Sequence, residues 1–142
     1  MLNDEIRSRI ADQIVGGPHG RHLGLQLDLV EEDRCIVRLP LAPHVMNGIG
    51  IVNGGATAAL IDAAGTSAAW ACNAASERSR GTTVGFTTNF LAPGRDGDLV
   101  AEARVIQRGG SLTIVSIVVG DTAGRQIASA LMTYKLDLRT LD

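Results

Sequence analysis

The sequence predicts an α+β fold in which an antiparallel β-sheet wraps around one long central α-helix. The stretch 55–76 is rich in alanine, contains no proline and is apolar or small on nearly every face. Alanine is the best helix former, and a helix without a polar face must be enclosed by the rest of the fold. Strand-like alternation precedes this stretch, and further alternating segments separated by short turns follow it, which is typical of antiparallel pairing.

Two kinds of element precede the central helix. Residues 1–17 predict an N-terminal amphipathic helix, because isoleucine recurs at every fourth position and a Gly-Gly-Pro sequence ends the pattern. These isoleucines are Ile6, Ile10 and Ile14. Residues 25–29 and 35–39 alternate apolar and polar side chains and predict a two-stranded hairpin.

Four strands are predicted after the central helix, each ended by proline, glycine or aspartate. They cover residues 82–91, 99–107, 112–119 and 126–136. The predicted order is therefore helix, two strands, long helix and four strands. A chain of 142 residues with 45% hydrophobic residues suits a single domain over residues 1–142.

Composition and charge narrow the functional classes. A formal net charge of −2 without a basic stripe argues against nucleic-acid binding. Cys35 and Cys72 lie far apart without CxxC spacing, which argues against a zinc ribbon or a disulfide framework. We find no apolar signal-peptide core, and the apolar stretch around the central helix is a poor membrane span because Asp62 interrupts it. We expect a cytoplasmic protein without a metal or other cofactor.

Asp62 is the residue that most requires an explanation. It interrupts the apolar central helix, where an ionised carboxylate is unfavourable unless it is paired or used. Its neighbours on the same helix face are small, including Gly55 seven positions before it and Thr66 four positions after it, so a ligand or another chain can approach closely. We expect Gly55 and Thr66 to contact the substrate. The alternative interpretation is a structural aspartate that caps a loop or pairs with an arginine.

Gly54 and Gly55 open the central helix roughly two turns before Asp62. Free N–H groups at a helix N-terminus carry the positive end of the helix dipole and can stabilise an oxyanion. Taken alone, such a pair is more often a plain glycine turn that enters a helix.

The combined pattern resembles the PaaI-type family of hotdog-fold acyl-CoA thioesterases. The spacing Asn47-xx-Gly50-xx-Asn53-Gly54-Gly55-xxxx-Leu60-Ile61-Asp62 is similar to the family signature, in which a His-Gly-Gly precedes a catalytic Asp. The segment 83–93, which ends in proline, resembles the family's strand after the helix, and the predicted element order is that of the hotdog fold.

The resemblance implies a division of labour among the site residues. Asp62 acts as nucleophile or general base on a thioester, and the Gly54 N–H forms the oxyanion hole. Asn47 helps to place the carboxylate or the water, and the Thr83 hydroxyl reaches the site from the facing subunit. The active site then lies at a dimer interface, in a homodimer or in a homotetramer formed as a dimer of dimers.

One residue departs from the family pattern, because Asn53 stands where the family has His. Its amide can donate a hydrogen bond to a carbonyl but cannot act as an acid or base. Coenzyme A, which enters as part of the acyl-CoA substrate, carries phosphates that arginines near turns can bind. The candidates are Arg80, Arg95 and Arg108, the last with Gly109 in a turn that resembles a family turn near the nucleotide.

Two other functions on the same fold remain open. The loss of the family His is compatible with a non-catalytic acyl-CoA-binding module. A 3-hydroxyacyl-thioester dehydratase requires a catalytic His in or near the central helix, and this chain has none there. The three histidines, His19, His22 and His44, lie in predicted loops without metal-ligand spacing.

Overall fold

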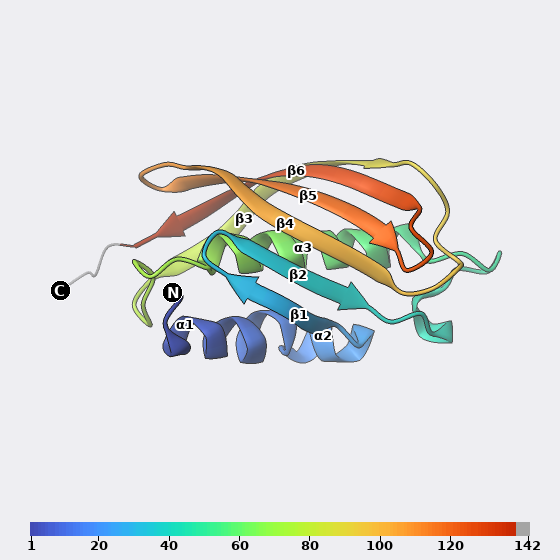
Figure 1. Ribbon diagram of the computed structural model, residues 1–142, viewed down its shortest axis with the longest axis horizontal. Helices are drawn as coiled ribbons and strands as arrows, with labels where there is room; N and C mark the ends of the chain where they lie inside the picture. The colour runs from blue at the N-terminus through green and yellow to red at the C-terminus, as the bar shows by residue number, and fades with distance from the viewer. Residues whose placement is uncertain (139–142) are drawn as a thin grey trace.

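The computed structural model describes residues 1–138. Three short helical segments open the chain, a hairpin of two strands follows, and a long helix separates this hairpin from four further strands (Figure 1). The elements are α1 (Asp4–Arg9), the π-helix η1 (Ile10–Val15), α2 (Pro18–Leu23), β1 (Gln26–Glu31), β2 (Arg34–Leu39), the 3-10 helix η2 (Pro43–Val45), α3 (Gly54–Trp70), β3 (Arg80–Phe90), β4 (Leu99–Arg108), β5 (Leu112–Asp121) and β6 (Gln126–Asp137).

All six strands form one antiparallel sheet in the order β1-β2-β4-β5-β6-β3. The sheet curls around α3, while the N-terminal helices lie beneath β1 and β2 (Figure 1). This arrangement confirms the predicted antiparallel sheet around a long helix. No helix in residues 1–138 is both long and apolar enough to cross a lipid bilayer.

The N-terminal segment differs from the single helix predicted over residues 1–17. After α1 the chain continues as one π-helical turn, in which the Gly16 N–H donates to the Ala11 carbonyl at 2.8 Å. Pro18 then begins α2, because the first position of a helix needs no N–H donor. His19 and His22, which the sequence placed in loops, therefore lie in a helix, and His44 lies in η2.

Helix α3 ends at Trp70 rather than continuing to residue 76 as predicted. Contacts from distant segments bind its last carbonyl groups. The Arg108 guanidinium donates to the Ala69 carbonyl at 2.9 Å, and the Asp33 N–H donates to the Ala71 carbonyl at 2.9 Å. Local helix propensity does not reveal such tertiary contacts, so the sequence overestimated the length of the helix.

Small residues let α3 pack directly on the inner face of the sheet. Gly65 is the closest point: a Cβ atom there would lie 2.5 Å from Met132 Sδ and 3.2 Å from Ile117 Cδ1. Met132, Ile117 and the neighbouring Leu60 are completely buried, so the core has little room for another methyl group.

We expect Gly65→Ala to destabilise the fold by about 1–3 kcal/mol, because the added methyl group overlaps Met132. Helix propensity alone predicts the opposite sign, a gain of about 1 kcal/mol. Urea denaturation of the variant and the parent protein distinguishes these outcomes.

The Met132→Val background is the matched control, because valine has no δ atoms to overlap the new methyl group. The loss caused by Gly65→Ala should shrink there. A Gly65→Ala variant more stable than the parent would contradict the packing described here.

Candidate active site

Asp62 lies in the middle of α3, where the helix is not covered by the sheet. Most of α3 is buried, but a stripe of small residues that includes Ala58, Ala59, Ala63 and Thr66 is only half-buried, and Asp62 lies on this stripe. The stripe forms part of a cavity of about 410 Å³. The lining residues are Ile14, His19, Gly20, Leu25, Ala58, Ala59, Asp62, Ala63, Thr66 and Phe86.

Thr83 on β3 is the hydrogen-bond partner of Asp62. Its Oγ1 donates to Asp62 Oδ1 at 2.7 Å, and both residues belong to the same chain. The family resemblance implied a hydroxyl from the facing subunit, so the position of Thr83 is a correction. Within residues 1–138 no arginine, lysine or histidine forms an ion pair with Asp62, which argues against an arginine-paired structural aspartate.

Tyr134 on β6 completes the polar surroundings of Asp62. It lies opposite Thr83 in the β3–β6 ladder, and its hydroxyl accepts a hydrogen bond from Trp70 Nε1 at 2.8 Å. Burial raises the pKa of Tyr134, the Trp70 hydrogen bond opposes this rise, and the negative charge of Asp62 adds to it.

The N-terminus of α3 presents an exposed backbone donor at Gly54. Asn53 caps the helix: its Oδ1 accepts from the Gly55 N–H at 2.7 Å. The Gly54 N–H has no acceptor among the described residues, and Gly54 is exposed. The Asn53 amide oxygen is therefore engaged in the cap, while the Gly54 N–H is available to a ligand.

Asp62 and Gly54 lie in different cavities of one chain. Gly54 lines a second cavity of about 340 Å³, together with Asn47 and Phe90. Eight positions separate Gly54 from Asp62, which is about 12 Å along a helix. A thioester carbonyl cannot contact both groups of one chain at hydrogen-bond distance.

Asn47 shapes its own loop in this structure. Its Oδ1 accepts from the backbone N–H groups of Ile49 and Ile51, at 3.0 Å and 3.2 Å. It does not line the cavity at Asp62. Among the other predicted contact residues, Thr66 lines that cavity, whereas Gly55 lines neither it nor the cavity at Gly54.

The candidate arginines for coenzyme A differ in their availability. The Arg108 guanidinium is already engaged, because it donates to Asp33 at 2.7 Å and to the carbonyl groups at the end of α3. Arg80 and Arg95 are both exposed, and Arg80 donates through Nη1 to the Glu77 and Ser79 carbonyls, each at 2.9 Å. Gly109 is confirmed in a tight turn, in which its N–H donates to the Leu112 carbonyl at 2.8 Å.

His19 is the lining residue that sequence reasoning set aside. It lines the cavity at Asp62 together with Ile14, Gly20 and Leu25. Pro18 after Gly17 was the sequence signal for the helix that contains His19, because proline favours the first position of a helix.

Comparisons with known proteins agree with this architecture. A curated protein of Saccharolobus solfataricus named "Putative esterase" is 28% identical over 130 residues, which are 92% of this chain and 86% of that protein. A crystal structure of a thioesterase family protein from Silicibacter pomeroyi matches with a TM-score of 0.85 and 23% identity, over 93% of this chain and 98% of that one. A thioesterase structure from Streptococcus pneumoniae with coenzyme A matches with a TM-score of 0.71 and 16% identity, over 80% of this chain and 85% of that one.

These structural matches confirm the hotdog fold. The family model described as the thioesterase superfamily matches residues 49–128, more than half of the chain, and includes α3 with both Gly54 and Asp62. The chain belongs to the thioesterase superfamily.

Proposed function

We propose that this thioester hydrolase is an acyl-CoA thioesterase of the PaaI type, in which Asp62 drives cleavage of the thioester. The observation that carries the proposal is the environment of Asp62. Its carboxylate lies on the uncovered stripe of a mostly buried helix and lines a cavity, and its partner among residues 1–138 is a hydroxyl rather than a cation. A carboxylate held in this way is available to accept a proton or to attack a carbonyl carbon.

In the proposed reaction Asp62 acts at the carbonyl carbon of the thioester, and the Gly54 N–H acts at its oxygen. Asp62 takes a proton from water as the water attacks, or attacks the carbon itself to form an acyl-enzyme anhydride that water then hydrolyses. In both routes the carbonyl oxygen becomes an oxyanion, and the Gly54 N–H at the positive end of α3 stabilises it. The oxyanion then collapses and the C–S bond breaks, so that coenzyme A leaves as a thiolate. In the water route the thiolate takes the proton that Asp62 removed from water, and in the anhydride route it takes a proton from solvent water.

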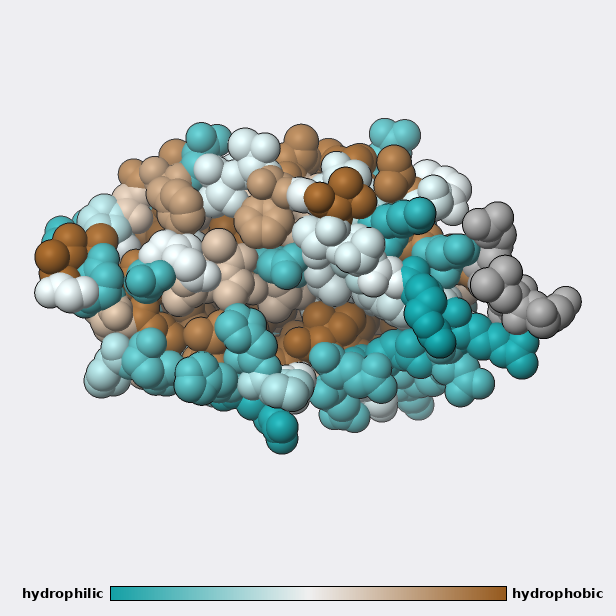
Figure 2. Space-filling model, turned by 180° about the vertical axis from the view of Figure 1, so that it is seen from behind, coloured by the Kyte–Doolittle hydropathy of each residue, from teal (hydrophilic) through white to brown (hydrophobic). Residues whose placement is uncertain are grey.

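The distance between Gly54 and Asp62 requires two chains for one site. If two copies pair with their α3 helices antiparallel, Asp62 of one chain can approach Gly54 of the other. Strand β3 suits such pairing: among the described strands it pairs with β6 alone, it carries a single charged residue, Arg80, and it exposes Val84 and Phe90. Seen from behind, the middle and upper parts of the molecule are largely apolar or weakly polar, and strongly polar residues gather along the lower edge (Figure 2).

The opposite edge of the sheet is less suitable for pairing. Strand β1 is short, carries Asp28 and Glu31, and has an irregular register between Leu27 and Leu29. Such features discourage edge-to-edge association. We therefore propose a homodimer through β3, with a dimer of dimers as its further assembly.

The remaining expectations follow from the same proposal. Coenzyme A is present in the Streptococcus pneumoniae structure, and we propose that Arg80 and Arg95 contact its phosphates here. Cys35 and Cys72 are free and buried, and burial raises the pKa of Cys35 to about 12. Unpaired thiols suit the reducing cytoplasm, where we place the protein.

We expect Asp62→Asn to lower kcat for acyl-CoA hydrolysis by about 10²–10⁴-fold, because the amide keeps the shape of the side chain but is neither a base nor a nucleophile. Release of the coenzyme A thiol, followed with a thiol reagent, measures this change. Thermal unfolding provides the control, and the variant should melt close to the parent. Undiminished turnover would show that Asp62 does not drive the reaction, and a parent that binds but never cleaves acyl-CoA would favour the binding-module alternative.

A second prediction concerns the sharing of the site between chains. Gly54→Pro removes the N–H at the first helical position, where proline is tolerated, and the extended backbone of Asn53 (φ −59°, ψ 133°) is compatible with a following proline. We expect this variant, like Asp62→Asn, to be nearly inactive on its own.

Unfolding the two variants together and refolding them as a mixture should restore activity, because each hybrid dimer then contains one site with both groups intact. Each variant refolded alone is the control. A mixture as inactive as its components would show that both groups act within one chain.

A further inference from the structure

The cavity at Asp62 is completed by a part of the chain that the family model does not match. The match covers residues 49–128, whereas four lining residues precede it. These residues are Ile14, His19, Gly20 and Leu25. The cavity wall opposite α3 is therefore supplied by the N-terminal segment, residues 1–23, and by Leu25, which lies just before β1.

Close packing of backbone on backbone fixes the corner between η1 and α2. A Cβ atom at Gly16 would overlap the Ala11 carbonyl oxygen, and one at Gly20 would overlap that of Val15. At Gly17 it would lie 2.6 Å from the Gln13 carbonyl oxygen. Any side chain at these positions would push the two helices apart, so the glycines hold Ile14 and His19 beside the cavity.

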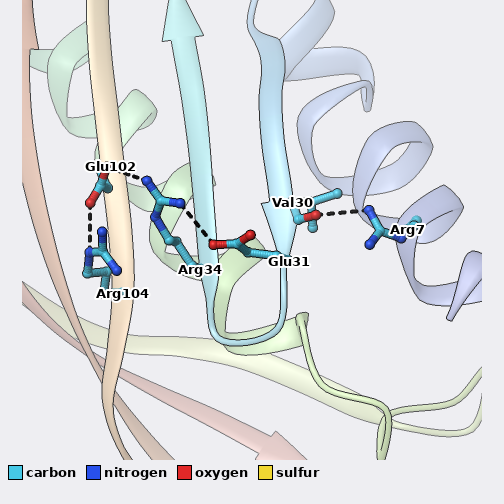
Figure 3. A network of polar contacts seen from close by, with 6 residues as sticks. All are labelled: Arg7, Val30, Glu31, Arg34, Glu102 and Arg104. Carbon is cyan, nitrogen blue, oxygen red and sulfur yellow. Dashed lines mark hydrogen bonds and ion pairs between the residues drawn. The ribbon is translucent and has the colours of Figure 1, made fainter. Parts of the chain in front are cut away.

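The segment is also fixed to the rest of the molecule. Ile6 and Ile10 are completely buried, and the Arg7 guanidinium donates to the Val30 carbonyl of β1 at 2.9 Å (Figure 3). The Arg9 guanidinium lies 5.4 Å from the centre of the Trp70 ring at the end of α3. These contacts make the wall an ordered part of the cavity.

Most of the bulk of the cavity wall comes from residues 14–25, which are the end of the N-terminal segment and the residues that lead into β1. The stripe of α3 contributes only small side chains, Ala58, Ala59 and Ala63, whereas Ile14 and Leu25 supply large apolar ones. Phe86 of β3 is the third large apolar residue. The space available beside Asp62 therefore depends on residues 14 and 25 more than on the helix.

Building on the function proposed above, we propose that the N-terminal segment is the acyl-specificity element of this enzyme. An apolar acyl group lies in the 410 Å³ cavity with its carbonyl toward Asp62 and its end against Ile14 and Leu25. The size of these two side chains sets the longest acyl group that the enzyme hydrolyses efficiently, because overlap with them prevents the carbonyl from reaching Asp62.

The test measures kcat/KM for straight-chain acyl-CoA esters from acetyl-CoA to decanoyl-CoA. Ile14 is half-buried, so its replacement is compatible with folding. Ile14→Ala should raise the long-to-short ratio of kcat/KM by about tenfold or more, and Ile14→Phe should lower it by a similar factor. A defect in folding alone cannot produce opposite shifts from two substitutions at one position.

Ile10→Ala is the matched control, because Ile10 lies in the same segment and is completely buried but does not line the cavity. It should lower the melting temperature and leave the ratio unchanged. Identical profiles for the parent and both Ile14 variants would overturn the specificity element while leaving the thioesterase proposal intact. A parent that hydrolyses no acyl-CoA ester would overturn the proposed function, and the specificity element with it.

Discussion

Contact between a helix of small residues and a curled sheet is the constraint on which the rest of this structure depends. At Gly65 the helix lies so close to Met132 that a Cβ atom would be 2.5 Å from its Sδ, so the methionine side chain would have to move to admit one. The same smallness leaves an open stripe on the other side of α3, where Ala58, Ala59 and Ala63 do not cover Asp62. Burial of one face and access to the other are thus two consequences of one alanine- and glycine-rich sequence.

Both groups that carry the proposed chemistry also belong to this helix. Its N-terminus offers the Gly54 N–H, which Asn53 leaves free by capping the next residue, and its middle offers the Asp62 carboxylate. Because about 12 Å separates them along the axis, the rigid helix prevents them from meeting within one chain. In our account dimerisation assembles the site, and the free edge of β3 provides the surface for it.

Much of this architecture could be predicted from periodicity. The central helix, the strand pattern and Asp62 as the residue requiring explanation all follow from local sequence, and the family resemblance indicated that the Thr83 hydroxyl belongs to the site. The errors arose where contacts between distant residues decide the outcome. Arg108 binds carbonyl groups at the end of α3, which ends at Trp70 rather than at residue 76, and Thr83 approaches Asp62 from a strand of the same chain. His19 was missed because Pro18, the first residue of α2, was interpreted only as the end of the preceding helix.

The most direct test of the shared site is a crystal structure of the protein with an acyl-CoA analogue in which a methylene group replaces the thioester sulfur. Such a ketone cannot be hydrolysed, so its carbonyl remains in the site. Our account predicts that the carbonyl oxygen accepts a hydrogen bond from the Gly54 N–H of one protomer and that the carbonyl carbon faces Asp62 of its partner. A carbonyl bound away from Asp62, or one contacted by a single protomer alone, would contradict it.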